Sequence, residues 1–277
     1  MSAQAGPLIC CRKVKLVGHL AGTLKGRVVI VIGGTGGIGS AVCVALGLAG
    51  ATIVAAGRSP VPESEHWNRL SKEIPEGRLT YEATDVTDIG RCRALMDIVV
   101  ARHGGLDAVL DCSNIMMAGL SGRFSDVDPG KFAAFLALKP GAFFNVCHAA
   151  FPHLMRRGGG SIVAFAADSG RVAAPNQSVV GASNAAIMMF VRALGLEMAA
   201  QNVRVNCIST SFVKDTPVYS NVMDGPLSSR ARTAAARAGL GLPFANDVAA
   251  LALFLCGPGS AHLTGQIISV NGGLSAG

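Results

Sequence analysis

The chain has 277 residues, of which half are hydrophobic and 15% are charged, and its formal net charge is +7. This length suits one large α/β domain, and the apolar content excludes a disordered chain. Aromatic residues are scarce and the basic residues are scattered, which argues against nucleic-acid binding. We find no uninterrupted run of 18 apolar residues, so no membrane span is expected.

Residues 1–23 are expected to form an N-terminal extension, followed by one domain over residues 24–277. The apolar stretch Leu8–Cys11 is too short for the core of a signal peptide. The eight cysteines show neither a CxxC motif nor the Cys/His spacing of a metal site. No metal is therefore expected, and a reduced cytoplasmic protein is the simplest interpretation.

Buried apolar runs alternate with helix-length segments along the whole chain. Strands are expected at residues 27–32, 51–56, 79–83, 107–111, 160–165, 203–208 and 266–270. Helices are expected at 38–50, 90–103, 130–157, 178–201 and 245–257. This alternation predicts an α/β fold of the Rossmann type, a doubly wound, seven-stranded parallel sheet with helices on both faces. Residues 214–241 are the least regular part, either a mobile lid over a ligand site or an ordinary surface insertion.

A glycine-rich turn joins the first strand to its helix, with Gly33, Thr35, Gly37, Ile38 and Gly39 as its key residues. Glycines let backbone N–H groups approach a pyrophosphate at the helix N-terminus. After a buried strand and before a helix, such a turn indicates a dinucleotide site. The alternative is a bare tight turn that serves only helix–strand packing.

The second strand ends with Gly57 and Arg58, where sites for NAD usually offer an acidic residue, and Gly57 removes that acid. An arginine there suits the 2′-phosphate of NADP, so NADP is favoured over NAD if a cofactor binds; a solvated arginine is the alternative. Asp85 and Val86 follow the third strand. Asp85 could bond an adenine amine, or could equally be a helix N-cap or turn aspartate.

Together these features resemble the short-chain dehydrogenase/reductase family over residues 24–274. The resemblance also rests on Pro152–Met155, Gly160–Val163, Arg204–Asn206 and the ending Thr264-Gly265-Gln266 with Val270–Gly273. It implies an NAD(P)-dependent oxidoreductase that assembles through its two long central helices into dimers or tetramers.

The resemblance also implies four catalytic residues, and this chain differs at each place. The family's tyrosine, which exchanges a proton with the substrate, falls on Val180, and its lysine falls on Asn184. Its serine falls on Ala167 and its asparagine on Leu138. Neither valine nor asparagine can exchange a proton near neutral pH. A shifted alignment cannot rebuild the tyrosine–lysine pair, because no lysine lies between Lys139 and Lys214.

Other polar residues near these positions could in principle support a rebuilt active site: His148, Asp168, Ser169, Ser178 and Ser183. No nucleophile elbow accompanies them, and each also suits a plain structural role.

We therefore expect a non-catalytic structural or regulatory subunit that pairs with an active paralogue in a heterodimer or heterotetramer. The family includes such arrangements, among them a 3-hydroxyacyl-CoA-type dehydrogenase of aromatic degradation. Two alternatives stay open: an atypical NADP-dependent oxidoreductase with a rebuilt site, and an NADP-binding sensor without turnover.

Overall fold

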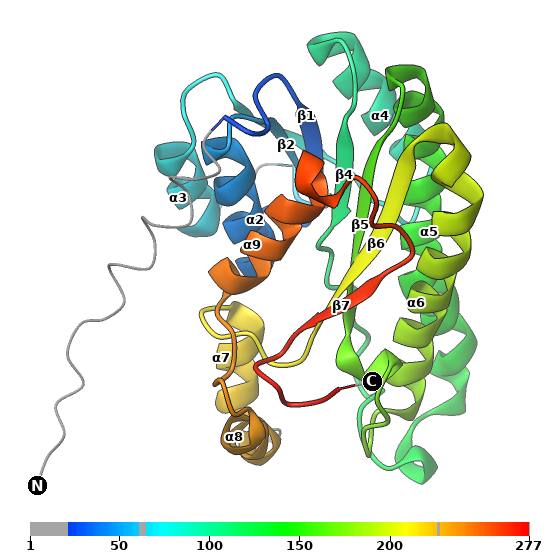
Figure 1. The fold of residues 1–277 in the computed structure, drawn as a ribbon. Helices are drawn as coiled ribbons and strands as arrows, with labels where there is room; N and C mark the ends of the chain where they lie inside the picture. The colour runs from blue at the N-terminus through cyan, green and yellow to red at the C-terminus, as the bar shows by residue number, and fades with distance from the viewer. Residues whose placement is uncertain (1–21, 61–64, 226–227, 277) are drawn as a thin grey trace, which may run out of the picture.

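A computed structural model describes residues 22–60, 65–225 and 228–276 (Figure 1). Its sheet has seven parallel strands in the order β3-β2-β1-β4-β5-β6-β7. The strands are β1 (Val28–Ile32), β2 (Thr52–Gly57), β3 (Leu79–Ala83), β4 (Ala108–Asp111), β5 (Gly160–Ala167), β6 (Val203–Thr210) and β7 (Ile267–Val270). The predicted Rossmann-type fold is confirmed. The predicted extension, residues 1–23, lies outside the described residues except for its last two positions.

Helices cover both faces of the sheet (Figure 1). They are α2 (Gly37–Leu48), α3 (Glu65–Glu73), α4 (Ile89–His103), α5 (Phe132–Arg157), α6 (Ser178–Met198), α7 (Pro217–Met223), α8 (Ser228–Arg237) and α9 (Ala245–Cys256). Helices α4, α5 and α6 pack on one face, and α2, α3 and α9 pack on the other. Every residue of β1 is buried because both of its faces are covered, which explains its unbroken apolar run.

Helices α5 and α6 form the long apolar layer of the first face. By length and composition alone, the stretches Pro129–Arg157 and Ser178–Gln201 could each cross a membrane. In the fold their apolar residues join the core under the sheet, as Phe143, Ile187 and Val191 show. Core helices of this kind need the same apolar content, so the finding says little about a membrane.

Residues 214–241, which the sequence pattern describes as irregular, contain α7 and α8. Both lie beyond the carboxyl ends of the strands (Figure 1). Thr216 caps α7 by accepting a hydrogen bond from the backbone N–H of Tyr219 at 3.2 Å. This segment therefore stands where ligands bind in open α/β sheets.

Candidate functional site

The glycine turn between β1 and α2 has no room for side chains at four positions, Gly33, Gly34, Gly37 and Gly39. Gly33 has a φ of +70°, and a Cβ on it would lie 2.8 Å from the carbonyl oxygen of Cys112. A Cβ on Gly39 would lie 2.1 Å from the carbonyl oxygen of Gly33. Helix α2 has no side-chain cap at its N-terminus and no acidic residue in its first turn. A glycine cradle before an uncapped helix N-terminus fits a pyrophosphate.

The start of α7 closes against this turn. A Cβ on Gly37 would lie 2.8 Å from Cβ of Thr216 and 3.0 Å from Cδ of Pro217. Thr35 and Ile38 are half-buried beside this contact, while Gly36 is exposed. The segment predicted as lid or insertion therefore contacts the glycine turn, which is the placement a lid requires.

Arg58 and Asp85 lie just after the carboxyl ends of β2 and β3. Arg58 is exposed, and Asp85 is half-buried. Hydrogen bonds from the side chain and then the backbone N–H of Thr87 lower the pKa of Asp85, and the charges of Arg58 and Arg91 add to this. The sequence alternative of a turn aspartate therefore describes Asp85, whereas the N-cap of α4 is Asp88. Val86 is a buried core residue.

Val180, the position of the family's tyrosine, is packed into an apolar cluster. Its side chain is 4% exposed and lies among Leu120, Val127, Phe135 and Val179. Close packing of this kind leaves no space for a substrate at Val180.

Asn184, the position of the family's lysine, is fully buried and uses both ends of its amide. Its Oδ1 accepts from the backbone N–H of Ala167 at 3.0 Å. Its Nδ2 donates to the carbonyl oxygen of Val180 at 2.8 Å. The structure therefore brings Ala167, Val180 and Asn184 together, and the asparagine holds the helix to the end of β5.

Leu138, the fourth position, faces elsewhere. It lines an open groove of about 400 Å³ along α5. The other residues of that groove are Thr87, Ala134, Ala137, Gly141, Ala142 and Asn145. This groove contains none of the other three catalytic positions.

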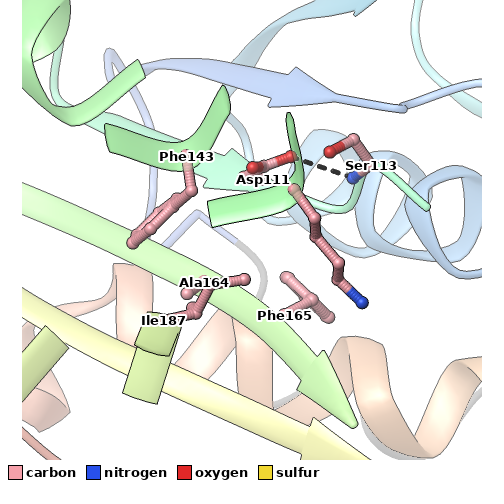
Figure 2. A pocket seen from close by; sticks show the side chains of 7 residues that line it. Asp111, Ser113, Phe143, Ala164, Phe165 and Ile187 are labelled. Carbon is pink, nitrogen blue, oxygen red and sulfur yellow. Dashed lines mark hydrogen bonds between the residues drawn. The ribbon is translucent and has the colours of Figure 1, made fainter. Parts of the chain in front are cut away.

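A charged pair that the sequence did not single out lies behind the same region. Asp111 at the end of β4 and Lys139 on α5 line a small cavity of about 10 Å³. Figure 2 shows Asp111 beside Ser113, whose backbone N–H it accepts at 3.0 Å, with Phe143, Ala164 and Ile187 opposite. Burial raises the pKa of Asp111 and lowers that of Lys139, although the proximity of Asp111 opposes the second shift. Lys139 directly follows Leu138, and only its position after that residue could have drawn attention to it.

The five residues that could have formed a rebuilt active site have separate structural surroundings. Asp168 is buried and accepts from Ser209 Oγ and Ser269 Oγ at 2.5 Å each, and from Asn271 Nδ2 at 2.7 Å. It thus joins the carboxyl ends of β5, β6 and β7. His148 and Ser178 are exposed on two different helices. Ser169 and Ser183 have buried hydroxyls without a hydrogen-bond partner in the described part of the chain. No hydrogen bond links a serine, a histidine and an aspartate within that part.

Metal ligation has no candidate cluster. Within residues 22–60, 65–225 and 228–276, no group of three or more His, Cys, Asp or Glu side chains could hold a metal ion.

Known proteins are similar to this chain over nearly the whole domain, including the glycine turn. A family model described as enoyl-(acyl carrier protein) reductase matches residues 33–275. The chain belongs to the short-chain dehydrogenase/reductase family. Members of this family use NAD(P). A tropinone reductase homologue of Arabidopsis thaliana is 30% identical over 254 residues, which cover 91% of this chain and 77% of that protein.

Other relatives agree over nearly the whole domain. The 3-oxoacyl-(acyl-carrier-protein) reductase of Thermotoga maritima is 29% identical over 255 residues, covering 91% of this chain and 98% of the relative. A short-chain dehydrogenase/reductase structure from Mycobacterium ulcerans has a TM-score of 0.82 at 27% identity, covering 91% of this chain and 90% of that one. Levodione reductase, at 20% identity, also has a TM-score of 0.82, covering 90% and 98% of the two chains, and supports the fold alone.

Proposed function

We propose that this short-chain dehydrogenase/reductase is a non-catalytic subunit of a hetero-oligomeric NAD(P)-dependent dehydrogenase. The proposal rests on two observations: Val180 is buried, and both ends of the Asn184 amide are hydrogen-bonded to the backbone. The tyrosine position holds a packed side chain, and the lysine position holds an amide whose donor and acceptor both bind backbone.

Proton transfer is what such a site lacks. Reduction of a carbonyl by a hydride from the nicotinamide also requires a proton for the oxygen, and oxidation of the alcohol requires that proton to be removed. Valine carries no ionisable group, and an amide neither gains nor loses a proton near neutral pH. The chain has two tyrosines, Tyr81 on β3 and Tyr219 on α7, and neither lies on α6 with the vacated positions.

Exposed apolar side chains on two helices support assembly with a partner. Helix α6 carries Met189 and Leu196 with 60% and 78% of their surface exposed, and Leu136 and Met155 are exposed on the adjacent α5. Large apolar side chains exposed along two neighbouring helices favour a protein partner. The proposed partner is an active paralogue that has the tyrosine and the lysine. Its substrate would carry a carbonyl group like the 3-oxoacyl group in the name of the Thermotoga maritima relative. A 3-hydroxyacyl-CoA-type dehydrogenase is one such partner.

The dinucleotide would be held by the glycine turn and Arg58. Bound there, it supplies a hydride acceptor or donor, and the residues of this chain bind and orient it. The tightly packed glycines fold the turn so that the uncapped N–H groups at the start of α2 are left for the pyrophosphate. The exposed guanidinium of Arg58 would attract a 2′-phosphate, so NADP is favoured over NAD. In a non-catalytic subunit this binding would stabilise the fold or signal the coenzyme level to the partner.

A second candidate function rests on the Asp111–Lys139 cavity. An amine and a carboxyl group whose pKa values are both shifted by burial are a possible proton-transfer pair. This would make the chain an atypical NADP-dependent oxidoreductase.

One experiment separates the two candidates. The purified chain is assayed with NADPH and NADH against 3-oxoacyl thioesters and cyclic ketones, alone and after co-purification with a related dehydrogenase. The non-catalytic role predicts no turnover by the isolated chain and turnover by the complex. Turnover by the isolated chain that Lys139→Met abolishes would establish the second candidate.

A further inference from the structure

The carboxyl end of β2 is shaped by a tyrosine from the neighbouring strand. In the parallel pairing of β2 and β3, Ala55 pairs with Tyr81 and Gly57 with Ala83. The side chains of residues 55, 57 and 81 therefore share one face of the sheet. Because Gly57 has no side chain, the Tyr81 ring has room on that face near the end of β2.

The Tyr81 hydroxyl occupies the space that a side chain at position 57 would need. A Cβ on Gly57 would lie 3.0 Å from Oη of Tyr81, whereas the nearest ring carbons would lie at 3.8 Å. The close contact thus comes from the hydroxyl, and the ring alone would be an ordinary neighbour. A side chain at position 57 would therefore require the hydroxyl to shift by a few tenths of an ångström, and its hydrogen bond to Ser59 resists that shift.

The same hydroxyl fixes the backbone that follows. It donates a hydrogen bond of 2.7 Å to the carbonyl oxygen of Ser59, two residues beyond Gly57. The ring is steadied by Trp67 of α3, edge to face, with centroids 5.5 Å apart. Since burial raises the pKa of Tyr81, the phenol keeps its proton and remains a donor at physiological pH.

Arg58 lies between Gly57 and Ser59, the two residues that the Tyr81 hydroxyl contacts. A carbonyl oxygen repels a phosphate, and the Ser59 carbonyl is bound by Tyr81, which ties it to β3. Arg58 itself is exposed and close enough to Asp85 to lower its pKa, so its charge acts at the mouth of the predicted adenosine site. Position 57 therefore carries no acid, the Ser59 carbonyl oxygen is held by a hydrogen bond, and the Arg58 guanidinium is left exposed.

We propose that Tyr81 is a specificity-determining residue, which restricts the site to adenosine ligands carrying a 2′-phosphate by excluding an acid at position 57 and binding the Ser59 carbonyl. This inference rests on the dinucleotide binding given under the proposed function, and it holds whether or not the chain catalyses a reaction. Tyr81 is on a different strand from the residues that the sequence analysis assigned to the cofactor.

The test is equilibrium binding of NADPH, NADH and adenosine 2′,5′-bisphosphate to the full chain by calorimetry. Tyr81→Phe keeps the ring and removes the hydroxyl. We expect NADPH and the bisphosphate to bind about five- to tenfold more weakly, the size of one lost hydrogen bond, with NADH binding unchanged. Ser71→Ala is the matched control, since it removes an exposed hydroxyl of α3 that bonds only within its helix. Equal losses for NADPH and NADH, or no loss, would overturn the proposal.

A second pair of variants tests the steric part. Gly57→Asp should weaken both coenzymes, because its Cβ pushes the Tyr81 hydroxyl away from the Ser59 carbonyl. Gly57→Asp combined with Tyr81→Phe should bind NADH more tightly than NADPH, because the close contact is gone. Tight NADH binding by Gly57→Asp alone would contradict the steric argument. Wild-type protein that binds none of the three ligands would refute this inference and retained dinucleotide binding, while leaving the proposed role as a partner subunit to its own assay.

Discussion

The side-chain Nδ2 of Asn184 donates a hydrogen bond of 2.8 Å to the backbone carbonyl of Val180, one helical turn earlier. At the same time Oδ1 of Asn184 accepts from the N–H of Ala167 at the end of β5. The position that would hold a catalytic lysine thus binds α6 to the sheet. Both hydrogen bonds of the Asn184 amide thus serve to hold structure.

Replacing Asn184 with Leu should destabilise the fold. The partly buried N–H of Ala167 would lose its partner, at a cost of about 1–3 kcal/mol in the free energy of unfolding. Urea unfolding of the variant measures this loss. Asn68→Leu, an exposed position on α3, is the control and should change stability by less than about 0.5 kcal/mol. A loss no greater at 184 than at 68 would show that the hydrogen bonds of Asn184 contribute little.

Restoring the family's pair should not restore activity. In Val180→Tyr with Asn184→Lys, the larger ring would overpack the cluster around Phe135 at a cost of about 1–3 kcal/mol, and the buried lysine would add to this. Val180→Tyr alone is compared with Val218→Tyr, whose position is 52% exposed and tolerates the ring. Turnover of a ketone by the stable double variant would show instead that the rest of the active site is intact.

The glycine turn should tolerate no side chain at Gly39. Its Cβ would lie 2.1 Å from the carbonyl oxygen of Gly33, so Gly39→Ala must distort the turn. We expect a loss of more than about 2 kcal/mol, as for other strained or overpacked sites. Gly141→Ala is the control: nothing lies within 4 Å of its Cβ, and alanine in the interior of α5 should stabilise by about 0.5–1 kcal/mol. Thermal unfolding of both variants measures the difference. Equal melting temperatures for Gly39→Ala and Gly141→Ala would contradict the predicted clash at Gly39.

Acid should destabilise the fold through Asp107. Burial alone would raise the pKa of this carboxyl, but hydrogen bonds from Val28 N–H, Arg157 and Arg27 more than offset it, so its pKa is lowered in the folded state. The stabilisation is therefore present above the ordinary pKa of an aspartate, near ~4, and is lost as the pH falls below it.

Asp107→Asn tests this directly. The variant should be less stable than the wild type at pH 7, and the difference should shrink between about pH 4 and pH 3 as the wild-type carboxylate is protonated. Urea unfolding at four pH values follows the change. Glu76→Gln, at an exposed turn, should give a pH-independent difference near zero. A constant difference for Asp107→Asn across the range would exclude the linkage.

How far the sequence predicts this molecule depends on the range of the interactions involved. Apolar runs such as Val28–Ile32 predict the central strands, because burial on both faces leaves a local pattern. The outer strands β3 and β7 were also predicted, although they are only partly buried and β3 carries polar side chains. Helices α3, α7 and α8 were not predicted, since they are short and two of them are polar, and their formation depends on packing against the rest of the chain.

The candidate site divides in the same way. The glycine turn and the four replaced catalytic positions can be read directly from the chain. The double hydrogen bond of Asn184 and the cavity shared by Asp111 and Lys139 require residues far apart in sequence to meet in three dimensions. The contact of Tyr81 with Gly57 likewise depends on the register of β2 and β3, which no local pattern states.

The most direct test of the central claim is native mass spectrometry of the chain isolated at its natural level from its own cells. A non-catalytic subunit predicts a complex in which this chain is joined to a second short-chain dehydrogenase that has the Tyr-x-x-x-Lys pair, identified by its peptides. A complex that contains only copies of this chain, while the related dehydrogenases of the same cell are present and unbound, would contradict the account.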